Sequence, residues 1–288
     1  MQNRIKRTRV KSIIFTFIGA AFFPVYPLIS MCWMTKHLVF CFFTSMLAVI
    51  VGAAILHYGA RLKKEYRELF KTYYVKKILD ENFDDVVYEW KKGYPYSKMQ
   101  KAHLIVNQDF VSEDYLKASY NGIKFEQADI RCALPNYGSK SNPCEHVLYG
   151  KIMEIAALPI KVSEIQIYTM GFSVRGRYRN SRNKPYYTSD KTFDYRFQVY
   201  ACNEKEAEKI LTPALREKLI EYAMCNQAFG LSFIGNKLYI GINTYRNTFD
   251  IQNGLRKVDF EQENVNITED VKAIKDWLSI VDIICELP

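Results

Sequence analysis

The sequence predicts an α+β protein: an N-terminal two-helix transmembrane hairpin followed by a mainly antiparallel sheet domain with late helices. Three observations predict this class. Two long apolar runs stand near the N-terminus, alternating β-branched and aromatic residues begin at about residue 103, and helix signals gather late in the chain. Strand–helix–strand alternation, which is typical of a parallel sheet, is missing. We expect a hairpin at 1–58, an amphipathic juxtamembrane helix at 59–82 and an α+β domain at 83–288.

Both apolar runs, at 12–34 and 38–58, are long enough to cross a bilayer, which takes about 20 helical residues. A cleaved signal peptide is the alternative for the first run. It needs an apolar core of about 7 to 15 residues and a small-x-small cleavage site, and this run offers neither. Small residues at 19–21 and 52–54 would let the two helices pack closely. The lipid bilayer is therefore the expected partner of residues 12–58.

The formal net charge of +9 is unevenly distributed. Residues 1–11 contribute +5 and residues 59–79 contribute another +5, whereas residues 80–288 carry −2. The basic surplus thus belongs to the membrane flanks, and we expect no nucleic-acid partner. Because basic flanks stay in the cytoplasm, we expect a multi-pass protein of the bacterial inner (plasma) membrane with both termini cytoplasmic. An odd number of domain cysteines, five, favours free thiols in a reducing compartment.

The segment after the second run has the spacing of an amphipathic helix. Leu62, Tyr66, Leu69 and Tyr73 recur on one face, with charged residues between them. The pattern continues to about Asp80, which is too short for a coiled coil. We therefore expect a helical stalk with these four residues on its buried face.

Alternating segments predict the strands of the domain. They are 120–126, 147–152, 164–168 and 195–200. Gly122 and Gly150 interrupt the first two segments and predict turns there. A later pair of apolar segments on either side of Gly235 and Asn236 predicts a β-hairpin.

Capping residues predict three helices after these first strands. Asn203, with Glu206 three residues later, predicts a capping box. Thr212 before Pro213 predicts the start of a second helix. Thr268 is expected to cap the terminal helix. The predicted buried stripe of that helix is Val271, Ile274, Leu278, Val281 and Cys285.

Several short stretches carry a resemblance to a known family. They are 112–115, 120–125, 128–129, 193–200, 206–207, 210–215, 230–233 and 236–240, with 210–215 the most specific. In this order they resemble the bacterial membrane-protein family called domain of unknown function 3137, over roughly 68–243. Where the family usually has an acidic pair, this chain has Tyr187-Thr188-Ser189-Asp190. The resemblance implies a fold and a membrane location, but no activity.

Few residues of the domain suit catalysis or metal binding. Cys144, Glu145 and His146, with Cys132 upstream, are the best metal candidates, but structural zinc usually takes four ligands in paired spacings. A phosphate-binding glycine loop, a zinc-protease helix and a nucleophile elbow are all missing from the sequence. The acidic pair at 113–114 is expected in solvent or at a helix cap. We predict no catalytic, cofactor-binding or metal-binding residue, and favour a protein that is not an enzyme.

One segment of the domain contains an unusually high density of basic residues. Its members are Arg175, Arg177, Arg179, Arg182 and Lys184, interleaved with tyrosines. An ordinary solvated hairpin tip would explain it. The functional hypothesis is contact with anionic lipid headgroups, because each basic residue near such a surface contributes about 1 kcal/mol.

The sequence therefore predicts a membrane-anchored cytoplasmic interaction module that binds a protein partner or anionic lipid headgroups. Two alternatives stay open. A small-ligand sensor would hold an apolar cavity inside the sheet. An enzyme or transport accessory would assemble a site from scattered residues with shifted pKa values.

Overall fold

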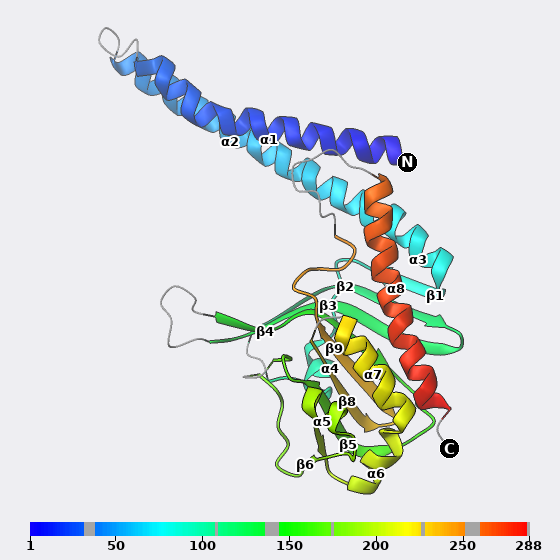
Figure 1. Ribbon diagram of the computed structural model, residues 1–288. Helices are drawn as coiled ribbons and strands as arrows, with labels where there is room; N and C mark the ends of the chain where they lie inside the picture. Colours follow the sequence, from blue (N-terminus) through cyan, green and yellow to red (C-terminus); the bar gives the residue numbers. More distant parts are fainter. Residues whose placement is uncertain are drawn as a thin grey trace. The chain divides into compact units, whose positions relative to one another are not determined.

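The computed structural model describes residues 1–31, 38–106, 109–135, 144–173, 176–225, 228–250 and 260–286 (Figure 1). The chain divides into two compact units. The first contains Met1–Lys77 and the described part of Ile251–Asn266. The second contains the described parts of Ile78–Asp250 and Ile267–Pro288. The predicted class is confirmed: two long apolar helices pack together, and an antiparallel sheet with late helices follows.

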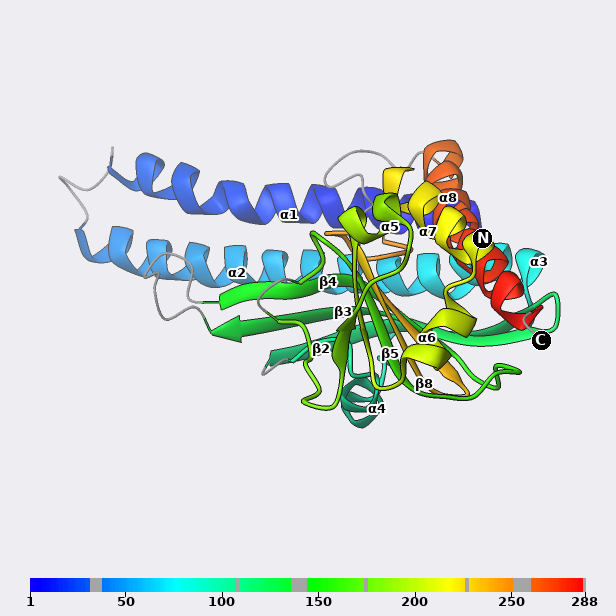
Figure 2. The same ribbon diagram turned by 60° about the horizontal axis from the view of Figure 1, so that its bottom comes forward.

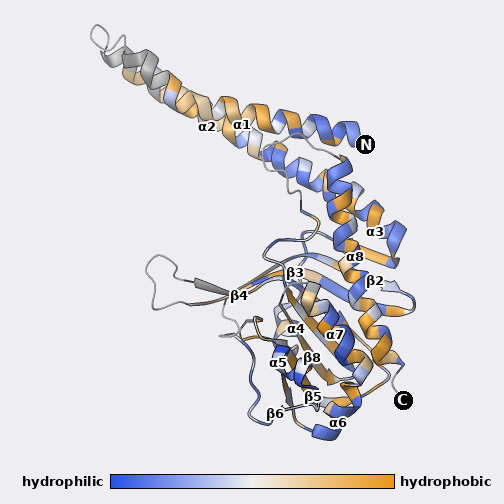
Figure 3. Ribbon diagram, in the orientation of Figure 1, coloured by the Kyte–Doolittle hydropathy of each residue, from blue (hydrophilic) through white to orange (hydrophobic). Residues whose placement is uncertain are grey.

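Two helices, α1 (Gln2–Met31) and α2 (Leu38–Leu69), pack side by side in the first unit. Glycines permit the close approach: a Cβ atom at Gly19 would lie 2.8 Å from Cγ of Leu56, and one at Gly52 would lie 3.1 Å from Cβ of Phe22. The predicted packing through small residues is confirmed. Both helices are long and apolar enough to cross a membrane, and hydrophobic residues follow their middle parts (Figure 3). These two candidate spans indicate association with a membrane.

The predicted stalk is helical but contains a π-helical turn. After α2 come η1 (Phe70–Val75) and α3 (Lys76–Asn82). The first three residues predicted on the buried face are buried, whereas Tyr73 is half exposed. A π-turn widens the hydrogen-bonded ring by one residue and so rotates the following side chains. Tyr74 packs instead, its ring 4.9 Å from that of Phe260 and its hydroxyl donating to the Phe260 carbonyl at 3.0 Å.

The second unit is built on one nine-stranded sheet. Its spatial order is β1-β2-β3-β4-β9-β8-β5-β7-β6, and every neighbouring pair is antiparallel. The strands are β1 (Asp84–Glu89), β2 (Asp109–Tyr120), β3 (Ile123–Pro135), β4 (Cys144–Ile155), β5 (Val162–Thr169), β6 (Lys184–Tyr186), β7 (Phe197–Ala201), β8 (Phe229–Gly235) and β9 (Lys237–Asn243).

Helices cover both faces of this sheet. They are α4 (Tyr96–Lys101), α5 (Lys191–Arg196), α6 (Glu204–Ile210), α7 (Pro213–Cys225) and α8 (Phe260–Cys285). Helix α4 lies on one face, whereas α5, α7 and the later part of α8 lie on the other (Figure 2). On that second face Trp277 of α8 packs on Phe229 of β8 with ring centres 4.9 Å apart.

Glycine plays different roles at the two predicted turns. Asn121 and Gly122 adopt positive φ angles and connect β2 to β3 as predicted. The prediction of a turn at Gly150 is wrong, because Gly150 lies inside β4 opposite Ile130 and Asn243. A side chain there would overlap the carbonyl oxygen of Ile242. Gly150 therefore permits close approach of β4 and β9.

The predicted caps of α6 and α7 are confirmed. The Asn203 side chain accepts a hydrogen bond from the amide of Lys205 at 3.0 Å, and Thr212 accepts from Leu215 at 3.3 Å. Glu206 does not complete the capping box. Its carboxylate accepts from the amide of Ser163 at 2.7 Å and joins α6 to the start of β5.

Two predicted elements begin elsewhere. The strand expected at 195–200 begins at Phe197, because Asp190 accepts hydrogen bonds from two amides and caps α5. The terminal helix begins at Phe260 and not after Thr268, because Phe260 packs on Tyr74 within the first unit. Its predicted stripe is buried except at Cys285, which is exposed near the end of the helix.

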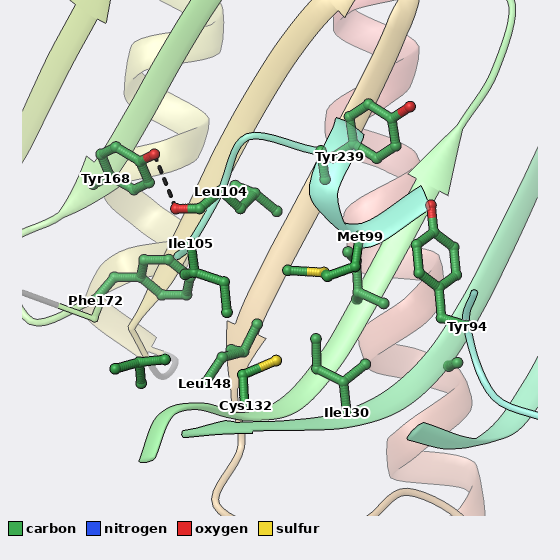
Figure 4. Packing of buried hydrophobic residues seen from close by; sticks show 14 of the residues in the cluster. Tyr94, Met99, Leu104, Ile105, Ile130, Cys132, Leu148, Tyr168, Phe172 and Tyr239 are labelled. Atoms are coloured by element: carbon green, nitrogen blue, oxygen red, sulfur yellow. Dashed lines mark hydrogen bonds between the residues drawn. The ribbon is translucent and has the colours of Figure 1, made fainter. Parts of the chain in front are cut away.

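The face under α4 holds a hydrophobic cluster that includes Met99, Leu104, Leu148 and Phe172 (Figure 4). Tyr168 crosses this cluster and its hydroxyl donates to the Leu104 carbonyl at 3.1 Å. The contact holds the segment after α4 against β5. That segment in turn borders the basic residues predicted to be functional.

Candidate functional site

The basic segment of the second unit divides into buried and exposed residues. Arg177 is buried, whereas Arg179 and Arg182 are exposed. Lys184 is also exposed, at the start of β6, the outermost strand of the sheet. Arg175 lies outside the described residues. The structure therefore presents Arg179, Arg182 and Lys184 to solvent.

Arg177 stabilises the backbone beneath this surface. Its Nε donates to the Phe172 carbonyl at 2.7 Å, and its Nη2 donates to the Thr169 and Met170 carbonyls at 2.8 and 2.9 Å. Its Nη1 donates to the Gln198 side chain. Burial lowers the pKa of the Arg177 guanidinium. This residue has a structural role and does not belong to the exposed basic surface.

The segment after α4 pairs with the basic segment. Ile105 and Arg177 form a β-bridge, and the amide of Tyr178 donates to the Leu104 carbonyl at 3.1 Å. The amide of Val106 donates to the Gly176 carbonyl at 2.7 Å. These backbone bonds fix the first half of the basic segment to residues seventy or more positions earlier in the chain.

A buried carboxylate fixes the second half. Glu164 of β5 accepts hydrogen bonds from the amide groups of Asn180 and Asn183 at 2.8 and 3.1 Å. Nδ1 of His103 lies 3.3 Å from the same carboxylate, and the His103 ring stacks on Tyr178 with centres 4.3 Å apart. Arg179 and Arg182 therefore project from a loop whose intervening residues are held in place.

One comparison with known proteins concerns this same part of the chain. A family model described as "Protein of unknown function (DUF3137)" matches residues 155–285. The chain resembles DUF3137. The match includes the basic segment and β5 to β9, and its description names no function. The resemblance predicted from the sequence is thus confirmed over 155–285, whereas the stretches before residue 155 lie outside the DUF3137 match.

One similar solved structure is the crystal structure of the mycobacterial trehalose monomycolate transport factor A, TtfA. It shares 10% sequence identity with this chain at a TM-score of 0.39. The similarity covers 72% of this chain and 90% of that one. No curated protein matches this chain in sequence.

A second polar cluster lies buried between the sheet and α8. Asp270 accepts from Arg246 Nη2 at 2.7 Å and from the amide of Phe249 at 3.0 Å, and Lys151 Nζ lies 3.7 Å away. Beside Lys151, Asp129 accepts two hydrogen bonds from Thr248. Burial and the neighbouring Asp114 carboxylate raise the pKa of Asp129 well above its usual value. The carboxylates and Lys151 are shielded from water, which favours a structural role for the cluster.

The expectation for the acidic pair at 113–114 is wrong. Asp114 is buried and accepts a hydrogen bond from the Tyr88 hydroxyl at 2.5 Å. Glu113 lies in β2 and accepts from the side chain of Asn247. A register shift in β2 accompanies the positive φ of Asp114. Such a bulge re-aims side chains, so sequence neighbours on this strand do not share a solvated face.

The side chains of Cys144, Glu145 and His146 lie outside the described part of the structure. Cys132 is buried in the hydrophobic cluster under α4, where burial raises its pKa to about 12. Cys132, Cys202 and Cys285 are free thiols. Within the described ranges, His, Cys, Asp and Glu side chains form no group of three or more that suits a metal.

Several residues that hold the basic segment in place could not be identified from the sequence. Glu164, Asn180 and Asn183 carried no motif, because their contact depends on how β5 and the loop meet. The burial of Arg177 was equally hidden. Its spacing from the exposed arginines is regular, and only the nearby carbonyl groups distinguish it.

Proposed function

We propose that this chain is a membrane-tethered interaction module whose sheet unit binds anionic lipid headgroups. One observation carries the proposal: Arg179, Arg182 and Lys184 are exposed on a segment that internal hydrogen bonds hold in place. Because the surrounding backbone is already ordered, binding loses little conformational entropy. Three basic residues at an acidic surface contribute about 3 kcal/mol, or roughly a hundredfold in affinity.

The charge of the unit favours a lipid surface over RNA as the anionic partner. Residues 80–288 carry a net −2, so the three cations form a local patch on an acidic background. RNA-binding domains usually carry a basic surplus that follows an extended backbone. A short patch suits headgroups at a membrane surface.

We expect vesicle binding to depend on this patch. The full chain in nanodiscs of neutral phosphatidylcholine should float with vesicles that contain phosphatidylglycerol. Replacing Arg179, Arg182 and Lys184 by serine should weaken the interaction at least tenfold, because three headgroup contacts are lost. Raising the salt to about 0.5 M should weaken it similarly by screening.

A matched control removes the same charge elsewhere. Lys117, Lys124 and Lys272 are exposed residues on β2, β3 and α8. Replacing all three by serine should leave most of the flotation intact. Equal loss in the two triple variants would reduce the effect to net charge, and no loss in either would refute lipid binding by the basic segment.

We further propose that both termini face the cytoplasm, since the basic residues flank the outer ends of the two candidate spans. A reporter domain that is active only in the cytoplasm should be active when fused to either terminus. A reporter that is active only outside should be inactive there. A reporter that requires the outside should become active when inserted at Lys36. An externally active reporter at either terminus would refute this topology.

A further inference from the structure

A pocket of about 450 Å³ opens in the second unit beside the end of β5. Helices α5 and α7, which lie side by side in both views, contribute to its wall (Figures 1 and 2). Its lining includes Met170, Gly171, Tyr195, Arg196, Ala223 and Ala228. This volume is within the range of small-molecule sites. None of these residues belongs to the exposed basic surface described above.

Arg196 contributes a positively charged side chain to the lining of the pocket. Its Nε is shielded from water and has no hydrogen-bond partner among the described residues. The nearby Asp194 carboxylate is engaged, since it accepts from the amide and hydroxyl of Thr188 at 3.0 and 2.9 Å. A buried donor left unpaired is costly, so an acceptor supplied by a ligand would stabilise the site.

Arg177 adds a second positive charge close to the same wall. It donates to the carbonyl oxygens of Thr169 and Met170, both of which line the pocket. Those carbonyls are therefore already paired with a cation and do not repel an incoming anion. The two arginines beside the pocket favour a negatively charged group within it.

The rest of the lining is largely apolar. Two large apolar side chains of the lining are exposed to solvent: Met170 is 51% exposed and Tyr195 is 81% exposed. Gly171 leaves space, because a Cβ atom there would meet only Ala228, at 3.7 Å. Exposed apolar side chains around a concave surface mark binding sites. A small inorganic anion would leave this apolar surface uncovered.

We infer that this pocket binds an amphiphilic anion, with its carboxylate or phosphate on Arg196 and its alkyl chain against Met170, Ala223 and Ala228. A charge-assisted pair with Arg196 would orient the head group, and the apolar wall would select an alkyl chain. The anion is either a free amphiphile or a membrane lipid. The two sources share this chemistry and are separated by experiment.

The test uses the full chain in phosphatidylcholine nanodiscs with a photoreactive diazirine derivative of dodecanoate. After illumination, mass spectrometry should locate the label on peptides that contain Met170, Tyr195 or Ala223. Dodecanoate should compete with the probe, whereas uncharged dodecanamide should not. A parallel arm with photoreactive phosphatidylglycerol in the nanodisc distinguishes a membrane lipid from a free amphiphile.

Two substitutions test the site independently. Arg196→Gln should lower labelling about tenfold by removing the charge-assisted pair. Ala223→Trp should block the pocket without a change of charge, and either variant counts only if its melting temperature is retained. Lys124→Gln, which removes an equal charge from an exposed position on β3, should leave labelling unchanged.

Label outside the pocket, or labelling that survives both Arg196→Gln and Ala223→Trp in folded protein, would overturn the inference. Failure of vesicle binding by the basic segment would leave this inference standing, because Arg179, Arg182 and Lys184 do not line the pocket. The pocket and the basic surface are thus tested by different residues and different measurements.

Discussion

Replacing Arg177 by methionine is expected to lower the free energy of unfolding of the sheet unit by about 3 kcal/mol or more. The substitution removes the side-chain donor of the Thr169, Met170 and Phe172 carbonyls. The Thr169 carbonyl keeps the amide of Phe172 at 3.1 Å, so the cost comes mainly from the Met170 and Phe172 carbonyls. Each buried acceptor left unpaired costs about 1 to 3 kcal/mol. Chemical unfolding of the full chain in nanodiscs, followed by a signal from the sheet unit, measures the change.

Arg179→Met provides the matched control, since Arg179 lies two residues away and is exposed. It should change stability by less than about 0.5 kcal/mol. Arg177→Lys should remain destabilising, because one ammonium group cannot reproduce the planar set of donors. Similar stabilities of the Arg177→Met and Arg179→Met variants would show that Arg177 has no structural role.

Replacing Asp270 by alanine is expected to destabilise the same unit by about 3 to 5 kcal/mol. Lys151, only 4% exposed, would lose the carboxylate at 3.7 Å, and the amide of Phe249 would lose its acceptor. A buried charge without its partner accounts for most of this cost. Unfolding of the full chain by denaturant, with the midpoint and slope both recorded, is the measurement.

The neighbouring Glu269→Ala variant is the control, because Glu269 is exposed on the same helix. It should unfold at the denaturant concentration of the wild type. Adding Lys151→Met to Asp270→Ala should recover part of the loss, since the unpaired charge is then removed. If Asp270→Ala alone matched Glu269→Ala, the buried cluster would not stabilise the junction of α8 with the sheet.

Sequence reasoning succeeded where the signal is local. The caps at Asn203 and Thr212 act within three residues, and the turn at Gly122 depends on its own φ angle. The glycines that allow α1 and α2 to pack could also be predicted from the sequence. A short connection makes neighbouring helices antiparallel partners, so small residues on both helices are expected to face each other. These elements require no knowledge of the rest of the fold.

The wrong predictions share another cause, which is a contact or a register that the local sequence does not show. Gly150 is required by a carbonyl on β9, Phe260 extends α8 through a contact with Tyr74, and Asp114 turns inward at a bulge. Tyr73 was predicted to be buried but is half exposed, because a π-helical turn rotates its side chain away from the buried face. In each case a partner distant in sequence, or a change of one residue in register, decided the outcome.

The candidate site follows the same division. The cluster of basic residues was visible in the sequence, but its separation into buried Arg177 and exposed Arg179, Arg182 and Lys184 was not. The pocket at Arg196 was hidden because 195–200 was expected to be a strand from its first residue. Asp190 capping α5 is the one local signal that pointed to the helix.

By itself, the sequence determined the two apolar helices that are candidate membrane spans, the location of the excess positive charge and the α+β class. These properties depend on hydropathy, formal charge and periodicity, which are sums over neighbouring residues. The tertiary structure alone decided which arginine is structural, which acids are buried and where Arg196 meets an apolar pocket. Those properties depend on burial and on partners brought together from distant segments, as Glu164 with Asn180 and Lys151 with Asp270 illustrate.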